Sequence, residues 1–336
     1  MARIVGRAVL GLVLVAFVAT MAQASGLHGD ATRPLRFNAA KSWGFQLQHI
    51  TMAKLVAASH DVLVVDYSKD GTEEQVFTPA ELAQLKRKPD GSPRIVLAYL
   101  SIGEAENYRY YWHWTWGGTL FGDLVGLFRA PPWLGPENGE WRSNYAVRYW
   151  RDDWQHIFLG EGGYLDRIIA SGFDGVYLDK VDTSVEAIAE GRESARDDMR
   201  TFVVRIAERA RAKSPGFLIV PQNGEELLED PAYVRVISGM GKEDLLYGAF
   251  KEQQPNPADH FASRIEMITP LRKAGKPVLA IEYIDRPGQI AAARTTLTKL
   301  GYVATFADRD LGHLRTGDLP DGDRAAKRKR RKWWFF

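Results

Sequence analysis

Eight short apolar runs recur along the chain, and stretches with helical spacing separate most of them. Most of the runs are continuously apolar rather than alternating, which indicates strands whose two faces are both covered. They span residues 43–48, 62–67, 94–102, 175–179, 217–221, 234–239, 278–283 and 302–306. This alternation predicts a parallel sheet, and we expect an α/β fold, a single (β/α)8 TIM barrel over residues 42–314. A doubly wound open sheet is the alternative, although the chain has neither a Gly-x-Gly-x-x-Gly fingerprint after a strand nor a Walker loop.

Helical spacing of apolar residues predicts helices at 78–88, 164–171, 198–213, 258–274 and 287–300. Residues 107–161 interrupt this rhythm and form a long insertion after the third predicted strand. The insertion holds seven of the ten tryptophans, together with several tyrosines. Some of these rings are expected to build a small core for the insertion, and others to pack against the apolar faces of sugars.

The first 24 residues have the pattern of a signal peptide. Arg3 and Arg7 precede an apolar run at 8–19, which is short for a membrane span, and Ala22-Gln23-Ala24 is a small-x-small cleavage pattern. We therefore expect cleavage after Ala24 and export to the periplasm or the extracellular space. An uncleaved N-terminal anchor is the alternative. Residues 25–41 are interpreted as a linker.

The charges are unevenly distributed along the chain. The net charge is +2, but Arg3, Arg7 and seven cationic residues at 324–332 account for nine positive charges, so the rest carries about −7. An acidic body argues against a nucleic-acid partner. The basic tail at 315–336, which ends in four aromatic residues, is either a disordered solubilising end or a contact to an anionic membrane or envelope surface. The chain has no cysteine, which excludes thiol catalysis and zinc–thiolate sites.

Acidic residues lie at the ends of six predicted strands, where the active sites of barrel enzymes are found. Helix caps can account for any single one of them, but less easily for six. A crowded ring of carboxylates raises the pKa values of its members, and general-acid catalysis needs such a group. The acids concerned are Asp66, Glu104, Asp179, Asp182, Glu243, Asp244, Glu282 and Asp308.

Cleavage of a glycosidic bond needs two carboxyl groups, one protonated for the leaving oxygen and one ionised as nucleophile or base. We predict that Asp179, at the end of the fourth predicted strand, and Glu243, just past the sixth in a glycine-flanked turn, form this pair. A calcium or magnesium site built from carboxylates is the competing use of such acids. Histidines are scattered away from these positions, and we expect no metal and no cofactor.

Several segments resemble glycoside hydrolase family 114, the endo-α-1,4-polygalactosaminidase-like extracellular proteins. The matching segments are 43–48, 66–71, 99–109, 149–150, 172–182, 221–224, 243–244 and 282–283, so the resemblance extends from about residue 42 to 314. It implies a TIM barrel that hydrolyses α-1,4-linked galactosamine polymers, with Asp179 as the nucleophile and Glu243 as the acid/base. A protonated amino sugar would suit an acidic rim.

The candidate substrate-binding residues are Asp66, Tyr99, Glu104, Tyr177, Asp182, Asn223, Glu282 and Tyr283. The expected partner is therefore a polysaccharide substrate. A non-catalytic polysaccharide-binding envelope or matrix protein on the same fold is the alternative, in which the acids hold a cationic polymer without cutting it. Relatives labelled as similar to cysteinyl-tRNA synthetase suggest no such role here, because the motifs of aminoacylation are missing.

Overall fold

The structure is a computed structural model that describes residues 30, 32–116 and 130–315. The predicted signal peptide and the basic tail after residue 315 lie outside the described residues. None of the described helices is long and apolar enough to cross a membrane.

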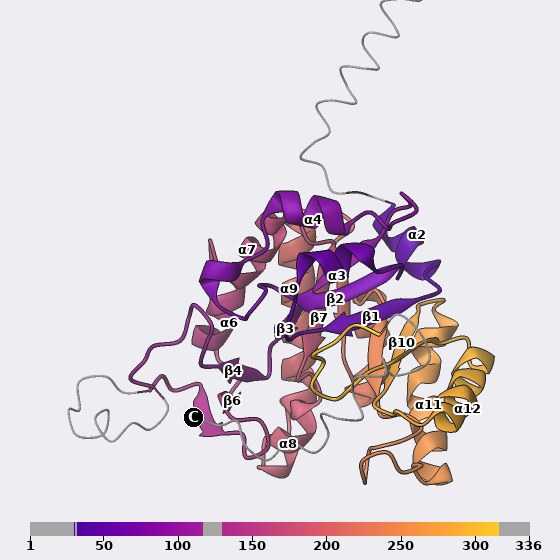
Figure 1. The fold of residues 1–336 in the computed structure, drawn as a ribbon. Helices are drawn as coiled ribbons and strands as arrows, with labels where there is room; N and C mark the ends of the chain where they lie inside the picture. The colour runs from indigo at the N-terminus through magenta and orange to yellow at the C-terminus, as the bar shows by residue number, and fades with distance from the viewer. Residues whose placement is uncertain (1–29, 31, 117–129, 316–336) are drawn as a thin grey trace, which may run out of the picture.

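The central sheet of the described chain has eight parallel strands, which follow one another in chain order (Figure 1). One ladder contains β1, β2, β3, β7 and β8, another contains β9, β10 and β11, and a bridge between Gln222 and Gly241 links them. Where β1 meets β11, the Trp43 indole donates to the Val303 carbonyl at 2.8 Å. This parallel α/β fold confirms the predicted class, in the strand order of a (β/α)8 barrel. The strands are β1 Trp43–Gln46, β2 Val62–Asp66, β3 Ile95–Ser101, β7 Gly175–Asp179, β8 Leu218–Pro221, β9 Met240–Glu243, β10 Val278–Glu282 and β11 Val303–Phe306.

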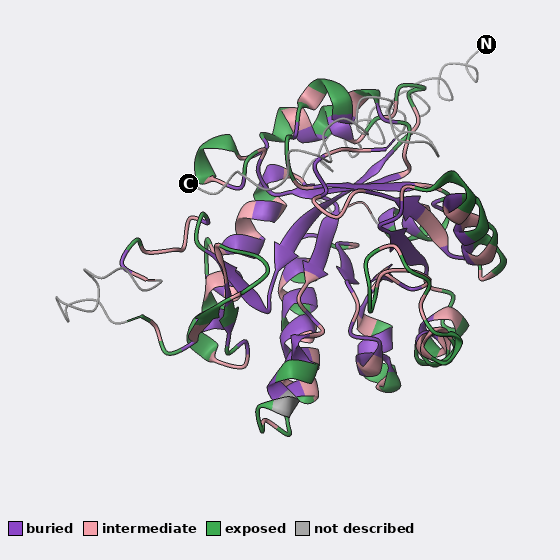
Figure 2. Ribbon diagram, turned by 60° about the horizontal axis from the view of Figure 1, so that its bottom comes forward, coloured by how far each residue is buried: buried purple, intermediate pink, exposed green. Residues whose placement is uncertain are grey.

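Helices surround the buried sheet and connect successive strands (Figure 2). The five predicted helices are present as α4, α7, α9, α11 and α12. Thr78 starts α4 with a capping box to Glu81, which explains why this helix begins where the sequence indicates. The helices are α3 Met52–Ala57, α4 Pro79–Leu85, α6 Asp152–Leu159, α7 Tyr164–Ser171, α8 Thr183–Ala189, α9 Ala195–Lys213, α10 Pro231–Val236, α11 Ala258–Lys273 and α12 Pro287–Lys299.

Side chains alternate between two buried faces along the strands. In β3, Leu97 and Tyr99 belong to the inner cluster, whereas Val96 packs in the outer cluster against the helices. Tyr177 of β7 is also in the inner cluster. Since alternate residues share a face, the residue two positions after Tyr177 points into the mouth of the barrel, and this residue is Asp179.

The insertion at 107–161 supplies two strands of a small antiparallel sheet. Its β6 (Asn144–Val147) pairs with its β5 (Leu134–Glu137) and with β4 (Glu104–Glu106), which comes just before it. Trp133 and Trp154 are buried, with ring centroids 4.7 Å apart. The insertion therefore has an aromatic core, and some of its rings build this core as the sequence predicts.

The sixth strand differs from the prediction. Residues 234–239 were expected to form it, but helix α10 (Pro231–Val236) occupies the start of this segment and strand β9 begins at Met240. The Asp230 side chain caps the helix by accepting from the Ala232 amide at 2.7 Å, and Pro231 suits the first helical position. This start signal outweighs the β-branched residues that follow, so Glu243 ends the strand rather than lying in a turn beyond it.

The expected linker at 25–41 contains helix α2 (Arg33–Asn38), which is part of the core. Phe37 is fully buried in the inner cluster, and it approaches Gly239 at the N-terminal end of β9. Arg33 forms an ion pair with Asp174 at 3.0 Å, just before β7. Helix α2 therefore covers the end of the barrel opposite the predicted site.

We predict that Phe37→Ala lowers the free energy of unfolding by about 3–5 kcal/mol, because it opens a cavity in the inner cluster. Leu35→Ala on the same helix is the matched control, since Leu35 is 71% exposed, and it should change stability by less than about 0.5 kcal/mol. Urea unfolding followed by circular dichroism measures both. Equal effects of the two substitutions would contradict a core role for α2.

Candidate active site

A cavity of about 670 Å³ opens at the C-terminal ends of the strands. Of the predicted site residues, it brings together Asp66, Tyr99, Asp179, Asp182, Glu243 and Tyr283. Asn223 contacts this group from behind Glu243. The carboxyl ends of parallel strands therefore gather the predicted acids in one hollow.

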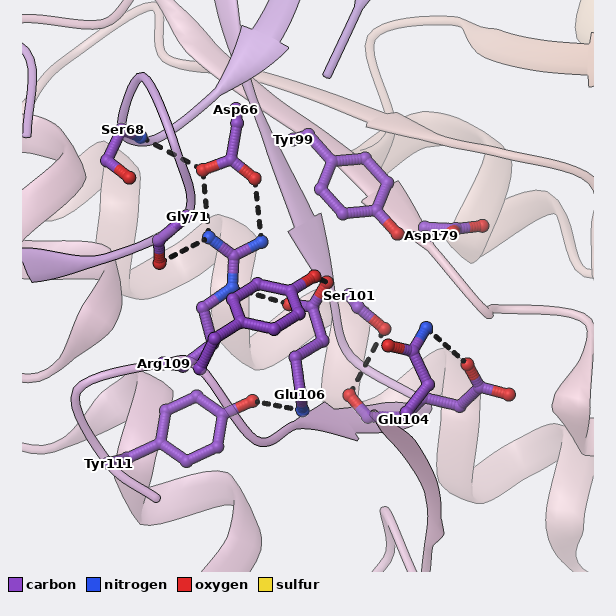
Figure 3. Close-up of polar contacts among 12 residues, drawn as sticks. Asp66, Ser68, Gly71, Tyr99, Ser101, Glu104, Glu106, Arg109, Tyr111 and Asp179 are labelled. Carbon is purple, nitrogen blue, oxygen red and sulfur yellow. Dashed lines mark hydrogen bonds and ion pairs between the residues drawn. The ribbon is translucent and has the colours of Figure 1, made fainter. Parts of the chain in front are cut away.

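Asp179 is the last residue of β7 and is held on both carboxylate oxygens. The Tyr99 hydroxyl donates to Oδ2 at 2.6 Å (Figure 3). The Lys180 amide donates to Oδ1 at 2.8 Å. Tyr99 reaches Asp179 because β3 and β7 are neighbouring parallel strands. Burial, together with the negative charge of Glu243, raises the pKa of Asp179 to about 6.

Glu243 faces Asp179 because the residues two positions earlier on their strands, Gly241 and Tyr177, contact each other inside the barrel. The Tyr177 ring fills the barrel interior beside Gly241, where any Cβ atom would overlap its hydroxyl group. Two residues further along each strand, Asp179 and Glu243 occupy the next layer above this contact. Glu243 also accepts two hydrogen bonds, from the Tyr283 hydroxyl to Oε2 at 2.9 Å and from an amide to Oε1.

That amide belongs to Asn223, which adopts a left-handed backbone (φ 55°) that asparagine tolerates better than most residues. Its Nδ2 donates to Glu243 at 2.9 Å, while its Oδ1 accepts from Lys242 Nζ at 3.1 Å. Lys242 in turn pairs with the buried carboxylate of Glu225 at 2.9 Å. Lys242 therefore holds the oxygen of the Asn223 side chain, so that the NH2 group of this amide faces Glu243 and donates to it.

Asp182 follows β7 and completes a group of three carboxyls. Asn223 Nδ2 lies 3.4 Å from its Oδ2 and so contacts both Asp182 and Glu243. Burial raises the pKa of Asp182 to about 7, and the charges of Asp179 and Glu243 act in the same direction. Asp179 and Asp182 are therefore the two carboxyls of this group whose pKa values are raised toward neutral pH.

Comparison with known proteins gives the family. The profile of glycoside-hydrolase family GH114 matches residues 25–321, which is most of the chain. The chain belongs to family GH114. Its fold and its family therefore both support a glycosidase.

Relatives of this GH114 chain occur in distant organisms. A protein of Methanocaldococcus jannaschii is 38% identical over 250 residues, which are 72% of this chain and 66% of that protein. A protein of Thermotoga maritima is 36% identical, over 73% of this chain and 71% of its own length. Among solved structures, the glycoside hydrolase domain of PelA from Pseudomonas aeruginosa matches with a TM-score of 0.61 and 21% identity, over 82% of this chain and 97% of that one. This last likeness supports the shared fold.

Besides Asn223, three predicted substrate residues of this GH114 chain lie outside the cavity lining. Tyr177 lies one layer below it, fully buried. Glu282 points to the other face of β10 and accepts from the amides of Leu246 and Tyr247 at 2.9 and 3.1 Å; burial raises its pKa to about 8. Glu104 is also buried and forms an ion pair with Lys180 at 3.1 Å. These three residues contact segments that surround the cavity and do not line it.

Sequence reasoning missed a buried arginine beneath one end of the cavity. Arg109 donates to both oxygens of Asp66, at 2.8 and 2.7 Å, and to Glu106 at 2.6 Å (Figure 3). Asp66 is thus a structural ion-pair partner as well as a cavity residue. Arg109 is the last residue of segment 99–109, which resembles family GH114. Its position in that segment was the one sign in the sequence that it could belong to the site.

The cavity lining also includes cations, and no set of acids and histidines among the described residues could hold a metal ion. Sequence reasoning singled out the acids at the strand ends and passed over the cations near them. They are Lys69, Arg142, Lys180 and Arg309.

We predict that Asp182→Asn stabilises the protein at pH 8 by on the order of 2 kcal/mol. In the folded chain Asp182 keeps its proton up to about pH 7, whereas an unperturbed aspartate loses it near 3.8. Between these two pKa values the folded state binds more protons at Asp182 than the unfolded state does. The stability that this group contributes is therefore lost as the pH rises from about 4 to about 7. The amide removes that dependence, and the advantage should disappear below about pH 4.

Urea unfolding at a series of pH values measures the difference between Asp182→Asn and the parent. Glu208→Gln, an exposed carboxyl on α9, is the control and should give superimposed curves. A stability difference that is the same at pH 4 and at pH 8 would show that Asp182 does not keep its proton in the folded chain.

Proposed function

We propose that the chain is an exported glycosidase that cleaves an α-1,4-linked galactosamine polymer, with Asp179 and Glu243 as the catalytic pair. The observation that carries this proposal is the placement of both carboxyls over one solvent-accessible cavity at the C-terminal ends of the strands. Membership of family GH114 supports glycosidic-bond hydrolysis. Export rests on the signal-peptide pattern of the first 24 residues.

In the proposed mechanism, an Asp179 oxygen attacks the anomeric carbon while the bond from that carbon to the leaving oxygen breaks. Glu243 gives the leaving oxygen a proton, and a covalent glycosyl ester forms on Asp179. Glu243 then takes a proton from water as the water oxygen attacks the anomeric carbon and releases Asp179. Burial raises the pKa of Asp182 to about 7, so this neighbour adds no full negative charge beside Glu243 near neutral pH.

The charge arrangement of the cavity supports a cationic amino sugar. Three of the four cations of the lining are held by acids outside it: Lys69 by Glu81 at 2.6 Å, Lys180 by Glu104 at 3.1 Å, and Arg309 by Asp244 at 2.7 Å. Their charges are therefore largely compensated from behind. The carboxylates of the cavity are left to face the substrate, and they would attract a protonated amine.

We predict that Asp179→Asn and Glu243→Gln each lower cleavage of de-N-acetylated galactosamine polymer by at least about a thousandfold. Both substitutions keep the size of the side chain and remove either the nucleophile or the proton donor. The assay counts new reducing ends, with the acetylated polymer as a second substrate. Asp259→Asn, in an exposed residue of α11, is the control and should cut at the parental rate.

The outcomes separate the competing functions. Full cleavage by either Asp179→Asn or Glu243→Gln would end the catalytic assignment. Polymer binding without cleavage by the parent protein would instead favour a non-catalytic polysaccharide-binding role.

The nucleophilic role of Asp179 also makes a stereochemical prediction. Two displacements at the anomeric carbon retain its configuration, so the first product from an α-linked polymer should be the α anomer. Proton NMR during the first minutes of the reaction reads this directly. Initial release of the β anomer would assign Asp179 the role of a base that activates water.

A further inference from the structure

Two aromatic rings of the insertion are placed differently from the others. In the part of the insertion that the structure describes, most rings pack on one another, as Trp133 does against Trp154. Trp141 and Tyr108 instead line the cavity and remain 44% and 41% exposed. An aromatic ring left partly exposed in a concave site retains apolar surface that a ligand can cover.

The ring of Tyr108 is fixed in place. Its hydroxyl donates to Glu106 Oε1 at 2.6 Å, and the Arg109 guanidinium lies 4.9 Å from the ring centroid. Gly71, with φ 88°, lets the neighbouring loop pass the ring, since a Cβ there would lie 2.8 Å from it. A ligand that covers this ring would pay little conformational entropy for ordering it.

Trp141 lies at the tip of the hairpin between β5 and β6. The Asn138 side chain accepts from the Trp141 amide at 3.1 Å and donates to Glu104 Oε1 at 2.8 Å. Glu104 also accepts from Asn144 at 3.3 Å and pairs with Lys180 at 3.1 Å. Glu104 thereby links the loop that carries Trp141 to the residue that directly follows Asp179, and so sets the position of the ring relative to the nucleophile.

We propose that Trp141 and Tyr108 form a distal saccharide-binding subsite, which takes pyranose units of the polymer away from the bond that is cut. This inference rests on the proposed function. The rings would cover the apolar faces of the sugars, and the Asn144 side chain and the Asp70 carboxylate, which also line the cavity, would meet their polar groups. The subsite extends the binding surface beyond Asp179, so affinity increases with chain length and cleavage is internal to the chain.

The test measures binding of galactosamine oligosaccharides of increasing length to the full chain carrying Glu243→Gln, by isothermal titration calorimetry. In this background Trp141→Ala should weaken binding of the longer oligosaccharides about ten- to a hundredfold and leave the shortest ones unchanged. Trp141→Phe keeps a flat ring and should retain most of the affinity. Trp114→Ala is the matched control, because Trp114 belongs to the same insertion and is 72% exposed but lies outside the cavity lining.

Each outcome decides one proposal. Equal affinities for Trp141→Ala and Trp114→Ala overturn the subsite, and parental cleavage of polymer would then leave the proposed function intact. A length-dependent loss in Trp141→Ala, together with no cleavage by the parent, supports the subsite and overturns the hydrolase. Absence of binding by the Glu243→Gln protein at every length overturns the subsite. Melting temperatures of all variants should agree within a few degrees, which separates lost contacts from lost folding.

Discussion

Repulsion between negative charges at the mouth of the barrel is the constraint that the rest of the site must satisfy. Asp179 and Glu243 each accept hydrogen bonds on both oxygens, from hydroxyl and amide groups. Neutral donors of this kind stabilise a carboxylate without cancelling its charge. The lysine next to Glu243 in sequence contacts the Asn223 carbonyl oxygen instead, so a positive charge lies one step behind the reacting group. The charge therefore remains available to a substrate or to a developing oxocarbenium ion.

A similar arrangement recurs at the other end of the cavity. Arg109 is buried between Asp66 and Glu106, where one cation serves two carboxylates and leaves the group with an excess of negative charge. Removing charged groups from water costs free energy that ion pairing only partly offsets, so such a cluster is weak evidence for stability. Its effect is geometric. It joins the end of β2 to β4, and it supports the ring of Tyr108 at the cavity wall.

The sequence predicted the fold class and acids that meet in the cavity, because both follow from periodicity. Continuous apolar runs indicate buried parallel strands, and the acids at their ends meet at one edge. Periodicity also explains a failure: Glu282 and Tyr283 are adjacent, so they face opposite sides of β10 and cannot both line the cavity. Glu104 could not be assigned from sequence, because its partners Asn138 and Lys180 come from distant segments. The shift of the sixth strand arose because a local Asp-Pro helix start overrode strand propensity.

Affinity and chemistry make opposite demands on such a cavity, and the insertion offers a way to separate them. Burial raises the pKa values of Asp179 and Asp182, so these carboxyls become harder to ionise as water is excluded. A site that gained all its affinity from charge would need its carboxylates ionised and would leave no proton for the leaving oxygen. Rings such as Trp141 bind the apolar face of a sugar without any charge. Binding energy supplied at a distance from the cut bond lets the site hold a sugar without requiring every carboxyl of the cavity to be ionised.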